Sequence, residues 1–449
     1  MNVVLINTYD LGRQPFGLAS PAAWLRRAGA GVELVDLSRQ RLPVNAVTSA
    51  DIVAFYLPMH TATRLALPVI DRVKTMNPAA TICAYGLYAP LNEQLLRQHG
   101  VSIVLGPEAE EDLVALASGH LEKSPPQRLG PEALPRLKFI QPDRAGLPAL
   151  DRYASLEMPD GSRKIVAATD ATRGCKHRCR HCPIVPVYDG QFRVVPVDVV
   201  MADVRAQVEQ GATHVSFGDP DFFNGPTHAR KIVEALHREF PEVSYDAIIK
   251  VEHLLEHRGL LPVLVETGCL FITSAVESVD DDILARLEKG HSRADFIAAA
   301  GACRSVGLTL VPTFVAFTPW TSIDGYIDLL NVVEDLDLAG HVAPVQWGIR
   351  LLVTWGSRLL ELDEIRTRVG PFDAKTLTYP WQHRDSRVDA LQRQVMAAAA
   401  DTASSRVAVF ETARELAHTA RGQLKTSLSI DLVLPSRSAI PYMNEPWYC

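Results

Sequence analysis

Three of the seven cysteines in this chain fall within eight residues. Cys175, Cys179 and Cys182 stand at positions i, i+4 and i+7 of one short segment, and the other four cysteines are scattered. An odd number with one tight cluster does not suit a disulfide framework, and in a reducing compartment such a cluster indicates metal binding or redox chemistry. The three thiolates can converge on a single inorganic centre.

Two kinds of centre fit this spacing. Three thiolates can hold three irons of a [4Fe–4S] cluster and leave the fourth iron open, whereas an electron-transfer cluster uses four cysteines. An open iron would take a small-molecule ligand, which implies catalysis. The alternative is a structural zinc ion in a non-catalytic protein, with His177 or His181 as the fourth ligand.

The first 120 residues alternate between short apolar segments and helical ones. We expect a domain over residues 1–120 with a Rossmann-like, doubly wound parallel sheet. Its strands are expected at 3–7, 32–37, 52–57, 81–86 and 101–106, and its helices at 20–29, 66–76, 91–100 and 108–119.

A proline-rich segment without clear periodicity follows, and we interpret residues 121–163 as a linker. The alternation then resumes over residues 164–356 with six βα-type units, fewer than the eight of a closed barrel. We therefore expect an α/β chain with a partial (β/α)6 barrel, followed by a helical region over residues 357–449. The barrel strands are expected at 164–171, 213–219, 243–250, 270–278, 308–317 and 345–353.

The overall composition narrows the class of protein. Apolar residues make up 47% and charged residues 22% of the chain, which argues against disorder. The net charge is −7 without a long basic run, so we expect no nucleic-acid partner. We see no signal peptide or membrane helix, and we expect a cytoplasmic location.

The cysteine segment directly follows the first strand of the βα series, where barrel enzymes place their active sites. At this point the chain resembles the radical S-adenosylmethionine (SAM) superfamily, whose signature is CxxxCxxC after the first barrel strand. Two further strand ends resemble its SAM-binding motifs. The second carries Gly218, Asp219, Pro220 and Asn224, and the fourth carries Glu277 and Ser278.

The resemblance implies a fold, cofactors and chemistry. Cys175, Cys179 and Cys182 would hold a [4Fe–4S] cluster, SAM would bind its open iron, and a reduced electron donor such as a flavodoxin or ferredoxin would supply the electron that cleaves SAM. Gly218, Asp219, Pro220, Asn224, Glu277 and Ser278 would contact SAM. We expect Arg173, Lys176, Arg178 and Arg180 either to moderate the cluster's charge or simply to be solvated.

The N-terminal domain resembles the cobalamin-binding domain that precedes many radical SAM barrels. Residues 106–110 stand where that group has a Gly-Glu-Gly-Glu type turn. That domain often carries Asp-x-His-x-x-Gly after its first strand, but residues 8–15 contain no histidine. Either cobalamin binds without a histidine ligand or the domain has lost it. His60, after the third strand, is expected to be an exposed loop residue.

The last residues resemble the tail of another radical SAM group. That group has a Cys-Cys-Ala-Glu-Pro tail and is related to the arsinothricin-biosynthesis enzyme, which implies transfer of a 3-amino-3-carboxypropyl group from SAM to trivalent arsenic. Here Tyr442 and Met443 replace the paired cysteines, and only Cys449 remains.

Our main expectation is thus a radical SAM enzyme that modifies a small molecule in specialised metabolism. The alternatives are the arsenic transferase, a cobalamin-dependent radical SAM methyltransferase and the zinc-stabilised protein.

Overall fold

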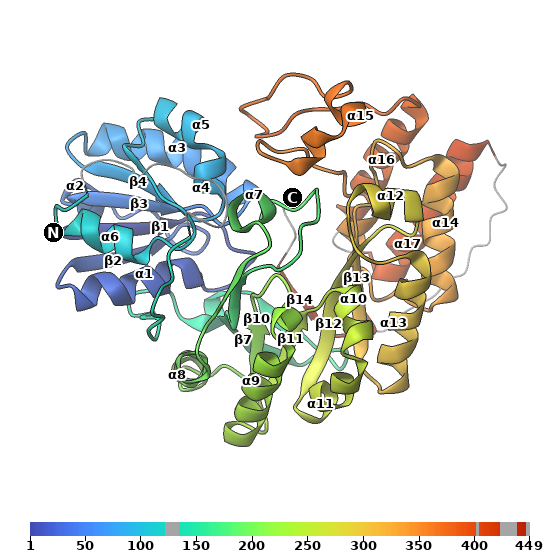
Figure 1. Ribbon diagram of the computed structural model, residues 1–449, viewed down its shortest axis with the longest axis horizontal. Coiled ribbons are helices and arrows are strands. Elements are labelled where there is room, and N and C mark those ends of the chain that lie inside the picture. Colours follow the sequence, from blue (N-terminus) through green and yellow to red (C-terminus); the bar gives the residue numbers. More distant parts are fainter. Residues whose placement is uncertain (122–133, 401–403, 423–437, 446–449) are drawn as a thin grey trace.

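The computed structural model describes residues 1–121, 134–400, 404–422 and 438–445. Figure 1 shows an N-terminal α/β domain beside a curled half-barrel sheet, with the helices of the C-terminal region packed on the far side of the barrel. The expected fold class is therefore confirmed. Cys449 and residues 122–133 of the expected linker lie outside the described residues.

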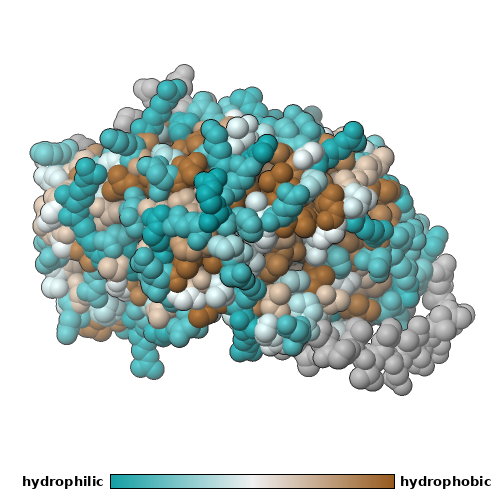
Figure 2. Space-filling model, turned by 90° about the horizontal axis from the view of Figure 1, so that it is seen from below, coloured by the Kyte–Doolittle hydropathy of each residue, from teal (hydrophilic) through white to brown (hydrophobic). Residues whose placement is uncertain are grey.

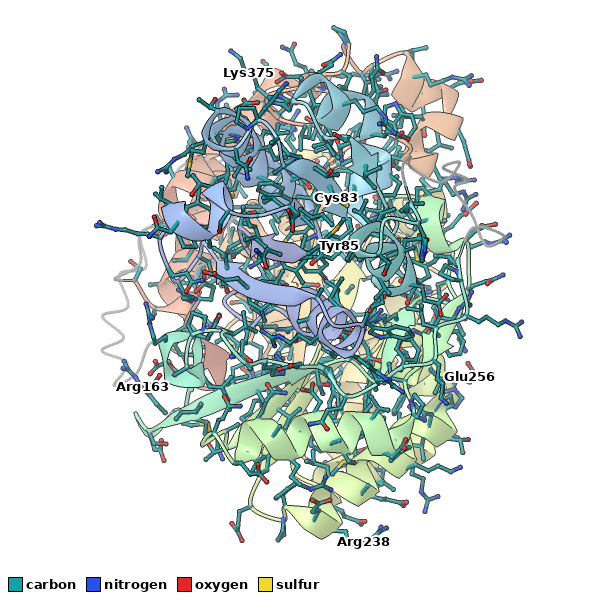
Figure 3. All side chains as sticks on the ribbon, turned by 90° about the vertical axis from the view of Figure 1, so that its left-hand side faces the viewer. Cys83, Tyr85, Arg163, Arg238, Glu256 and Lys375 are labelled. Atoms are coloured by element: carbon teal, nitrogen blue, oxygen red, sulfur yellow. The ribbon has the colours of Figure 1, made fainter. Side chains whose placement is uncertain are left out.

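The N-terminal sheet has five parallel strands in the order β2-β1-β3-β4-β5, and helices lie on both of its faces. Apolar side chains fill both faces of the strands, as parallel sheets require. Figure 3 shows two of them, Cys83 and Tyr85, among the strands of this domain. The strands are β1 Asn2–Asn7, β2 Gly31–Asp36, β3 Ile52–Tyr56, β4 Thr81–Tyr85 and β5 Ile103–Val104, which confirms all five predicted strands.

The helices of this domain differ from expectation mainly at their starts. We expected the first helix to begin at Ser20 with a proline in its first turn, but it begins at Phe16, and Pro21 lies inside it. Gly17 allows this earlier turn to pack on the ring of Tyr56, where a Cβ would lie 2.1 Å from the ring. The helices are α1 Phe16–Arg27, α2 Val44–Thr48, α3 His60–Met76, α4 Tyr88–Leu91, α5 Glu93–Gln98 and α6 Glu110–Ala117.

The barrel sheet has the strand order β13-β12-β11-β10-β7-β6-β14. Its first five members are parallel, and the last two add to the edge in antiparallel pairs. The strands are β6 Ser155–Glu157, β7 Arg163–Thr169, β10 His214–Phe217, β11 Ser244–Ile248, β12 Cys269–Glu277, β13 Thr309–Phe314 and β14 Tyr442–Met443. Strand β6 lies within the segment that we interpreted as a linker.

The expected sixth barrel strand, residues 345–353, does not form a regular strand. A 3-10 helix, Pro344–Trp347, occupies its start, and a single parallel bridge joins Arg350 to Phe317 beyond the end of β13. The side chain of Gln346 bonds to the free edge of β13 instead of a neighbouring strand. Its Oε1 accepts from the Phe314 backbone N–H at 2.9 Å.

Helices cover the outer face of the barrel sheet (Figure 1). Those of the βα units are α8 Val197–Val208, α9 Pro226–Glu239, α10 Val251–Glu256, α11 Leu261–Glu266, α12 Asp281–Arg286, α13 Arg293–Ser305 and α14 Ile323–Asp335. Beyond them, α16 Ser386–Ala399 and α17 Arg406–Arg421 pack into the same core through Leu391 and Phe410, while the short α15 Asp363–Arg366 lies apart from it. The C-terminal helices therefore complete the barrel domain.

No helix in the described part of the chain is both long and apolar enough to cross a bilayer. On the face shown in Figure 2, hydrophilic side chains are interspersed with hydrophobic ones.

Candidate functional site

The cysteine loop projects from a small two-stranded ribbon at the carboxyl end of β7. Strands β8 Thr172–Gly174 and β9 Phe192–Val194 pair in antiparallel fashion, and the Cys175 N–H donates to the Gln191 carbonyl at 3.1 Å. Gly174 has φ +79°, and a Cβ there would lie 2.4 Å from the Tyr188 ring. Only glycine fits this turn, which sends the chain into the loop. Helix α7 Val185–Tyr188 lies at the other end of the loop.

Residues after β10 fix the start of the loop. Asn224 binds on both sides of Cys175, because its Oδ1 accepts from Lys176 N and its Nδ2 donates to the Gly174 carbonyl, both at 3.1 Å. Asp219 is fully buried and accepts from Ala171 N and from the Thr172 hydroxyl, at 2.9 and 2.6 Å. Asp219 and Asn224, which we predicted to contact SAM, therefore hold the cysteine loop in place.

The end of β12 holds the other half of the loop. Glu277 has φ +68° next to an irregularity in strand register, and its Oε1 lies 3.1 Å from His181 Nε2 and 3.4 Å from Lys289 Nζ. Although burial alone would raise it, Lys289 and His181 lower the pKa of Glu277 to about 2. The neighbouring Ser278 accepts from Asp280 N at 3.1 Å. A role in SAM binding stays a prediction for Glu277 and Ser278.

The loop carries two sets of potential metal ligands, the three thiols and a group around His177. The ligand atoms of His177, Asp221 and His253 lie within 4.8 Å of one another. Burial raises the pKa of Cys175 to about 11 and of Cys182 to about 12, so an iron centre must displace their protons.

Three of the four basic residues around the cysteines have separate acidic partners. Arg173 points into the domain interface, where its guanidinium binds Glu108 at 3.0 Å and Glu110 at 2.8 Å. Arg180 binds Glu288 at 2.6 Å, and the exposed Arg178 pairs with Asp189 at 3.0 Å. Arg173 is thus not free to bind SAM.

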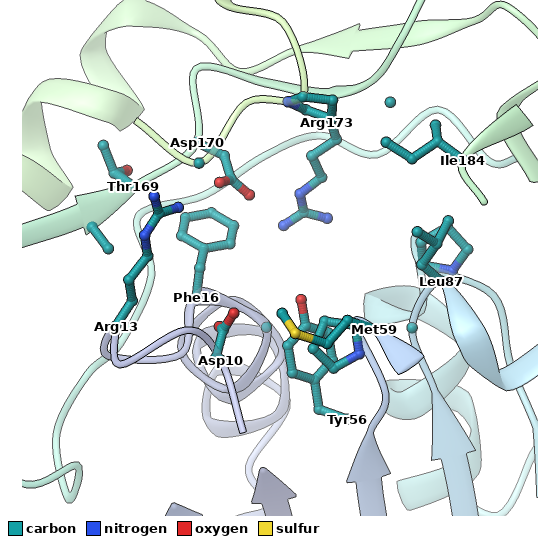
Figure 4. Close-up of a pocket in the computed structure, with 18 of the residues that line it drawn as sticks. Asp10, Arg13, Phe16, Tyr56, Met59, Leu87, Thr169, Asp170, Arg173 and Ile184 are labelled. Carbon is teal, nitrogen blue, oxygen red and sulfur yellow. The ribbon is translucent and has the colours of Figure 1, made fainter. Parts of the chain in front are cut away.

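A partly open cavity of about 270 Å³ lies between the two domains. Figure 4 shows that Asp10, Tyr56 and Leu87 enter it from the N-terminal domain, with Asp170 and Arg173 opposite. The side chains of Asp10, Tyr56 and Asp170 form no hydrogen bond with any described residue. Burial raises the pKa of Asp10 to about 7 and of Asp170 to about 6.

A second cavity, of about 220 Å³, lies inside the half-barrel. Alternate residues of β11, β12 and β13 line it, as do Arg13 and Gly218, which also line the first cavity. The hydroxyls of Thr273 and Thr313 and the guanidinium of Arg13 have no hydrogen-bond partner among the described residues. Tyr442 and Met443 form one wall beside Phe271.

Sequence reasoning missed several residues of the site. Lys250 and His253 follow β11, and Asp170 follows β7, so each stands at the carboxyl end of a barrel strand. That position was the available signal, because ligands of parallel α/β sheets bind there. The missed Asp10 and Arg13 lie in residues 8–15, the stretch in which the cobalamin-domain motif would place a histidine.

Comparison with known proteins agrees with this geometry. Residues 170–323 match the family model described as the radical SAM superfamily. The chain is 25% identical over 321 residues to hopanoid C-3 methylase of Methylococcus capsulatus, covering 68% of this chain and 62% of the relative.

Two further relatives act on different substrates. The tRNA-2-methylthio-N(6)-dimethylallyladenosine synthase of the same organism is 23% identical, covering 59% of this chain and 57% of the relative. The bacteriochlorophyllide d C-8(2)-methyltransferase of Chlorobaculum tepidum is 24% identical, covering 57% of this chain and 56% of the relative. The chain thus spans 56–62% of the length of these curated relatives.

Solved structures share the arrangement of both domains. The cobalamin-dependent radical enzyme OxsB with aqua-cobalamin bound superposes with a TM-score of 0.65 at 16% identity, covering 88% of this chain and 67% of that one. The methyltransferase TsrM from Kitasatospora setae, with tryptophan and a SAM analogue bound, superposes with a TM-score of 0.63 at 15% identity. The match covers 83% of this chain and 78% of that one. Residues 170–323 therefore match the radical SAM superfamily, and the chain shares the two-domain fold of OxsB and TsrM.

Proposed function

We propose that this protein is a cobalamin-dependent radical SAM methyltransferase that acts on a small molecule. This reading was one of our alternatives, and the relatives favour it over the broader expectation, because two of the three are named as methylating enzymes. When bound, the cluster and SAM would supply a radical that removes a hydrogen atom, and cobalamin would supply the methyl group.

The observation that carries the proposal is the cavity between the domains. It lies at the carboxyl edge of the N-terminal sheet and reaches Arg173 and Gly174, directly before the first cysteine. A corrin carries many amide side chains, and the unpaired Asp10, Tyr56 and Asp170 offer hydrogen-bonding groups to them. Because the cavity is partly open, a cofactor larger than 270 Å³ can bind with part of it outside.

Cobalamin would bind here without a histidine ligand. No histidine is among the described residues that line the cavity. His60 is buried at the start of α3 rather than exposed, and its Nε2 contacts the Thr376 carbonyl. The side chains after β1 that enter the cavity instead include Asp10 and Arg13.

The barrel cavity is the proposed substrate site. Phe271, Ile248 and Met443 give it an apolar wall, and the free hydroxyls of Thr273 and Thr313 can orient a polar group. The substrate would be a small molecule with an apolar body, comparable in kind to the tryptophan bound by TsrM. Gly218, shared by both cavities, stands where methyl donor and acceptor would approach.

Arsenic transfer has less support. Tyr442 and Met443 replace the tail cysteines in the cavity wall, and among the described residues no cysteine lines it. Soft thiolates would be the expected ligands of arsenic. A flavodoxin or ferredoxin stays the expected electron donor.

Binding of aquacobalamin to the reconstituted protein tests the proposal, followed by absorption spectroscopy. We expect the parent protein to bind it and Leu87→Trp to bind about tenfold more weakly, since extra volume in a packed site costs about 1–3 kcal/mol. Leu65→Trp, on the exposed face of α3, is the matched control and should bind like the parent. A parent protein that binds no cobalamin would overturn the proposal.

Product analysis then separates the alternatives. Methyl transfer predicts S-adenosylhomocysteine together with 5′-deoxyadenosine when SAM is supplied. Formation of methylthioadenosine alone would instead support transfer of the aminocarboxypropyl group.

A further inference from the structure

A continuous line of polar contacts runs from the cysteine loop into the barrel wall. His177, between Cys175 and Cys179, places its Nε2 3.2 Å from His253 Nε2. His253 Nδ1 lies 2.6 Å from Asp221 Oδ2, in the turn after β10. On the other side, Lys250 Nζ lies 3.0 Å from His177 Nδ1 and 3.0 Å from Glu252 Oε2.

The inner end of this line is deeply buried. His253 is fully buried and Asp221 is 1% exposed. Asp221 Oδ2 lies 2.6 Å from His253 Nδ1 and 3.5 Å from His177 Nε2, so the buried carboxylate depends on these two imidazoles. A buried carboxylate without these partners would be costly. Asp221 Oδ1 accepts from Phe223 N at 3.1 Å, which fixes the carboxylate in place.

The donors and acceptors along the line agree with one another. The Lys250 ammonium can only donate, so His177 Nδ1 accepts and His177 Nε2 carries the proton. His177 Nε2–H can then donate to His253 Nε2, and His253 Nδ1–H faces the carboxylate of Asp221. Each close pair in the line can therefore consist of one donor and one acceptor.

The same three side chains could instead be metal ligands, since their ligand atoms lie within 4.8 Å of one another. Lys250 argues against this, because a metal on His177 Nε2 would require a proton on Nδ1, which faces the ammonium at 3.0 Å, whereas the carboxylate oxygen Glu252 Oε2 lies 3.7 Å away. Metal-bound histidines normally donate that proton to a carboxylate or carbonyl.

We propose that Asp221 and His253 are positioning residues that hold His177, and with it the Cys175–Cys179 part of the loop, and that the Asp221 and Lys250 charges set the reduction potential of the cluster. The proposal rests on cluster binding by the loop and not on methyl transfer. Asp221 Oδ2 lies 3.5 Å from His177 Nε2 and Lys250 Nζ lies 3.0 Å from His177 Nδ1, so both charges lie beside the loop between its first two cysteines.

Anaerobically reconstituted Asp221→Asn and His253→Gln test the proposal. We expect both to lose iron to a chelator about tenfold faster than the parent, as loss of outer partners of metal ligands does. In an EPR-monitored titration, Asp221→Asn should shift the midpoint potential to more positive values, because a nearby negative charge is removed. Lys250→Met should shift it in the opposite direction. None of these readings requires turnover.

The matched control is His99→Gln, which removes the histidine of an exposed His–Asp pair (2.8 Å) in the N-terminal domain. It should change neither iron loss nor potential. Thermal melts identify variants that fail to fold; for those, Glu252→Gln at the half-exposed end provides the test and should shift the potential positively.

Two results would overturn the proposal. One is folded Asp221→Asn and His253→Gln proteins with the parent's rate of iron loss and potential. The other is a variant with all three loop cysteines changed to alanine that binds one zinc per chain and loses it on His253→Gln, which would establish a metal site.

Discussion

The carboxyl edges of the two sheets meet across one interface, yet they use their polar side chains in opposite ways. At the barrel edge, Asp219, Asn224 and Glu277 are bonded to the cysteine loop. At the edge of the N-terminal sheet, Asp10 and Tyr56 have no hydrogen-bond partner among the described residues.

This difference separates two ways of holding a cofactor. Three thiolates must be held in place to bind an inorganic centre. The polar groups of the barrel edge accordingly bond to the loop backbone and to the loop histidines. The large organic cofactor that we propose for the opposite edge would bring its own hydrogen-bonding groups, so the groups of that edge could stay free until it binds. We expect perturbations at the two edges to have different consequences.

The largest effect is expected at the barrel edge. Cys175→Ala, Cys179→Ala and Cys182→Ala should each abolish SAM cleavage and reduce iron well below about four per chain, since each removes one of three ligands. Iron analysis and product chromatography measure both. Cys303→Ala, a buried cysteine on α13, is the control and should keep iron and cleavage. Unimpaired cleavage in all three loop variants would contradict a catalytic cluster.

The second-largest effect is expected from Arg173, whose ion pairs connect the two domains. Arg173→Met leaves Glu108 and Glu110 buried without their cation and should lower the free energy of unfolding by about 3–5 kcal/mol. Chemical denaturation measures this. Arg178→Met in the same loop removes an exposed pair with Asp189 and should cost less than about 1 kcal/mol. Equal effects of the two would mean that Arg173 does not join the domains.

The smallest effect is expected at the N-terminal edge. Burial raises the pKa of Asp10 from 3.8 to about 7, so the folded state holds this proton more tightly than the unfolded state. The stability from this group is complete below about pH 4 and is lost as pH rises through about 7. Asp10→Asn should therefore weaken the fall in unfolding free energy between about pH 5 and about pH 8.

Denaturation at several pH values checks this, with Asp151→Asn on the exposed surface as the control. An Asp10→Asn profile parallel to that of the parent would show that Asp10 is already ionised in the cavity.

Local patterns were enough to predict most of the strands. All five N-terminal strands and the first five barrel strands were expected, because apolar runs bounded by turn residues mark buried parallel strands. The prediction of a sixth barrel strand over residues 345–353 was wrong. A 3-10 helix occupies the start of this segment, and a single bridge joins it to the sheet. Hydrophobicity alone does not distinguish these outcomes.

The roles of individual polar residues depend on partners that the sequence does not reveal. Arg173 was expected beside the cluster, but its partner Glu108 is 65 residues away in another domain. Asp219 and Asn224 were expected to contact SAM, and the loop that they hold lies more than 40 residues away. Only the fold brings such pairs together.

Strand β14 forms one wall of the barrel cavity and is the last strand of the chain to be synthesised. Asn444 binds the backbone of Ser155, 289 residues earlier in the chain. Contacts so distant in sequence form slowly, and during synthesis they must wait until almost everything between them has been made. The rest of the barrel can fold while this edge is still unpaired. Tyr442 and Met443 therefore complete the barrel cavity last, and we expect that cavity to open first at their strand.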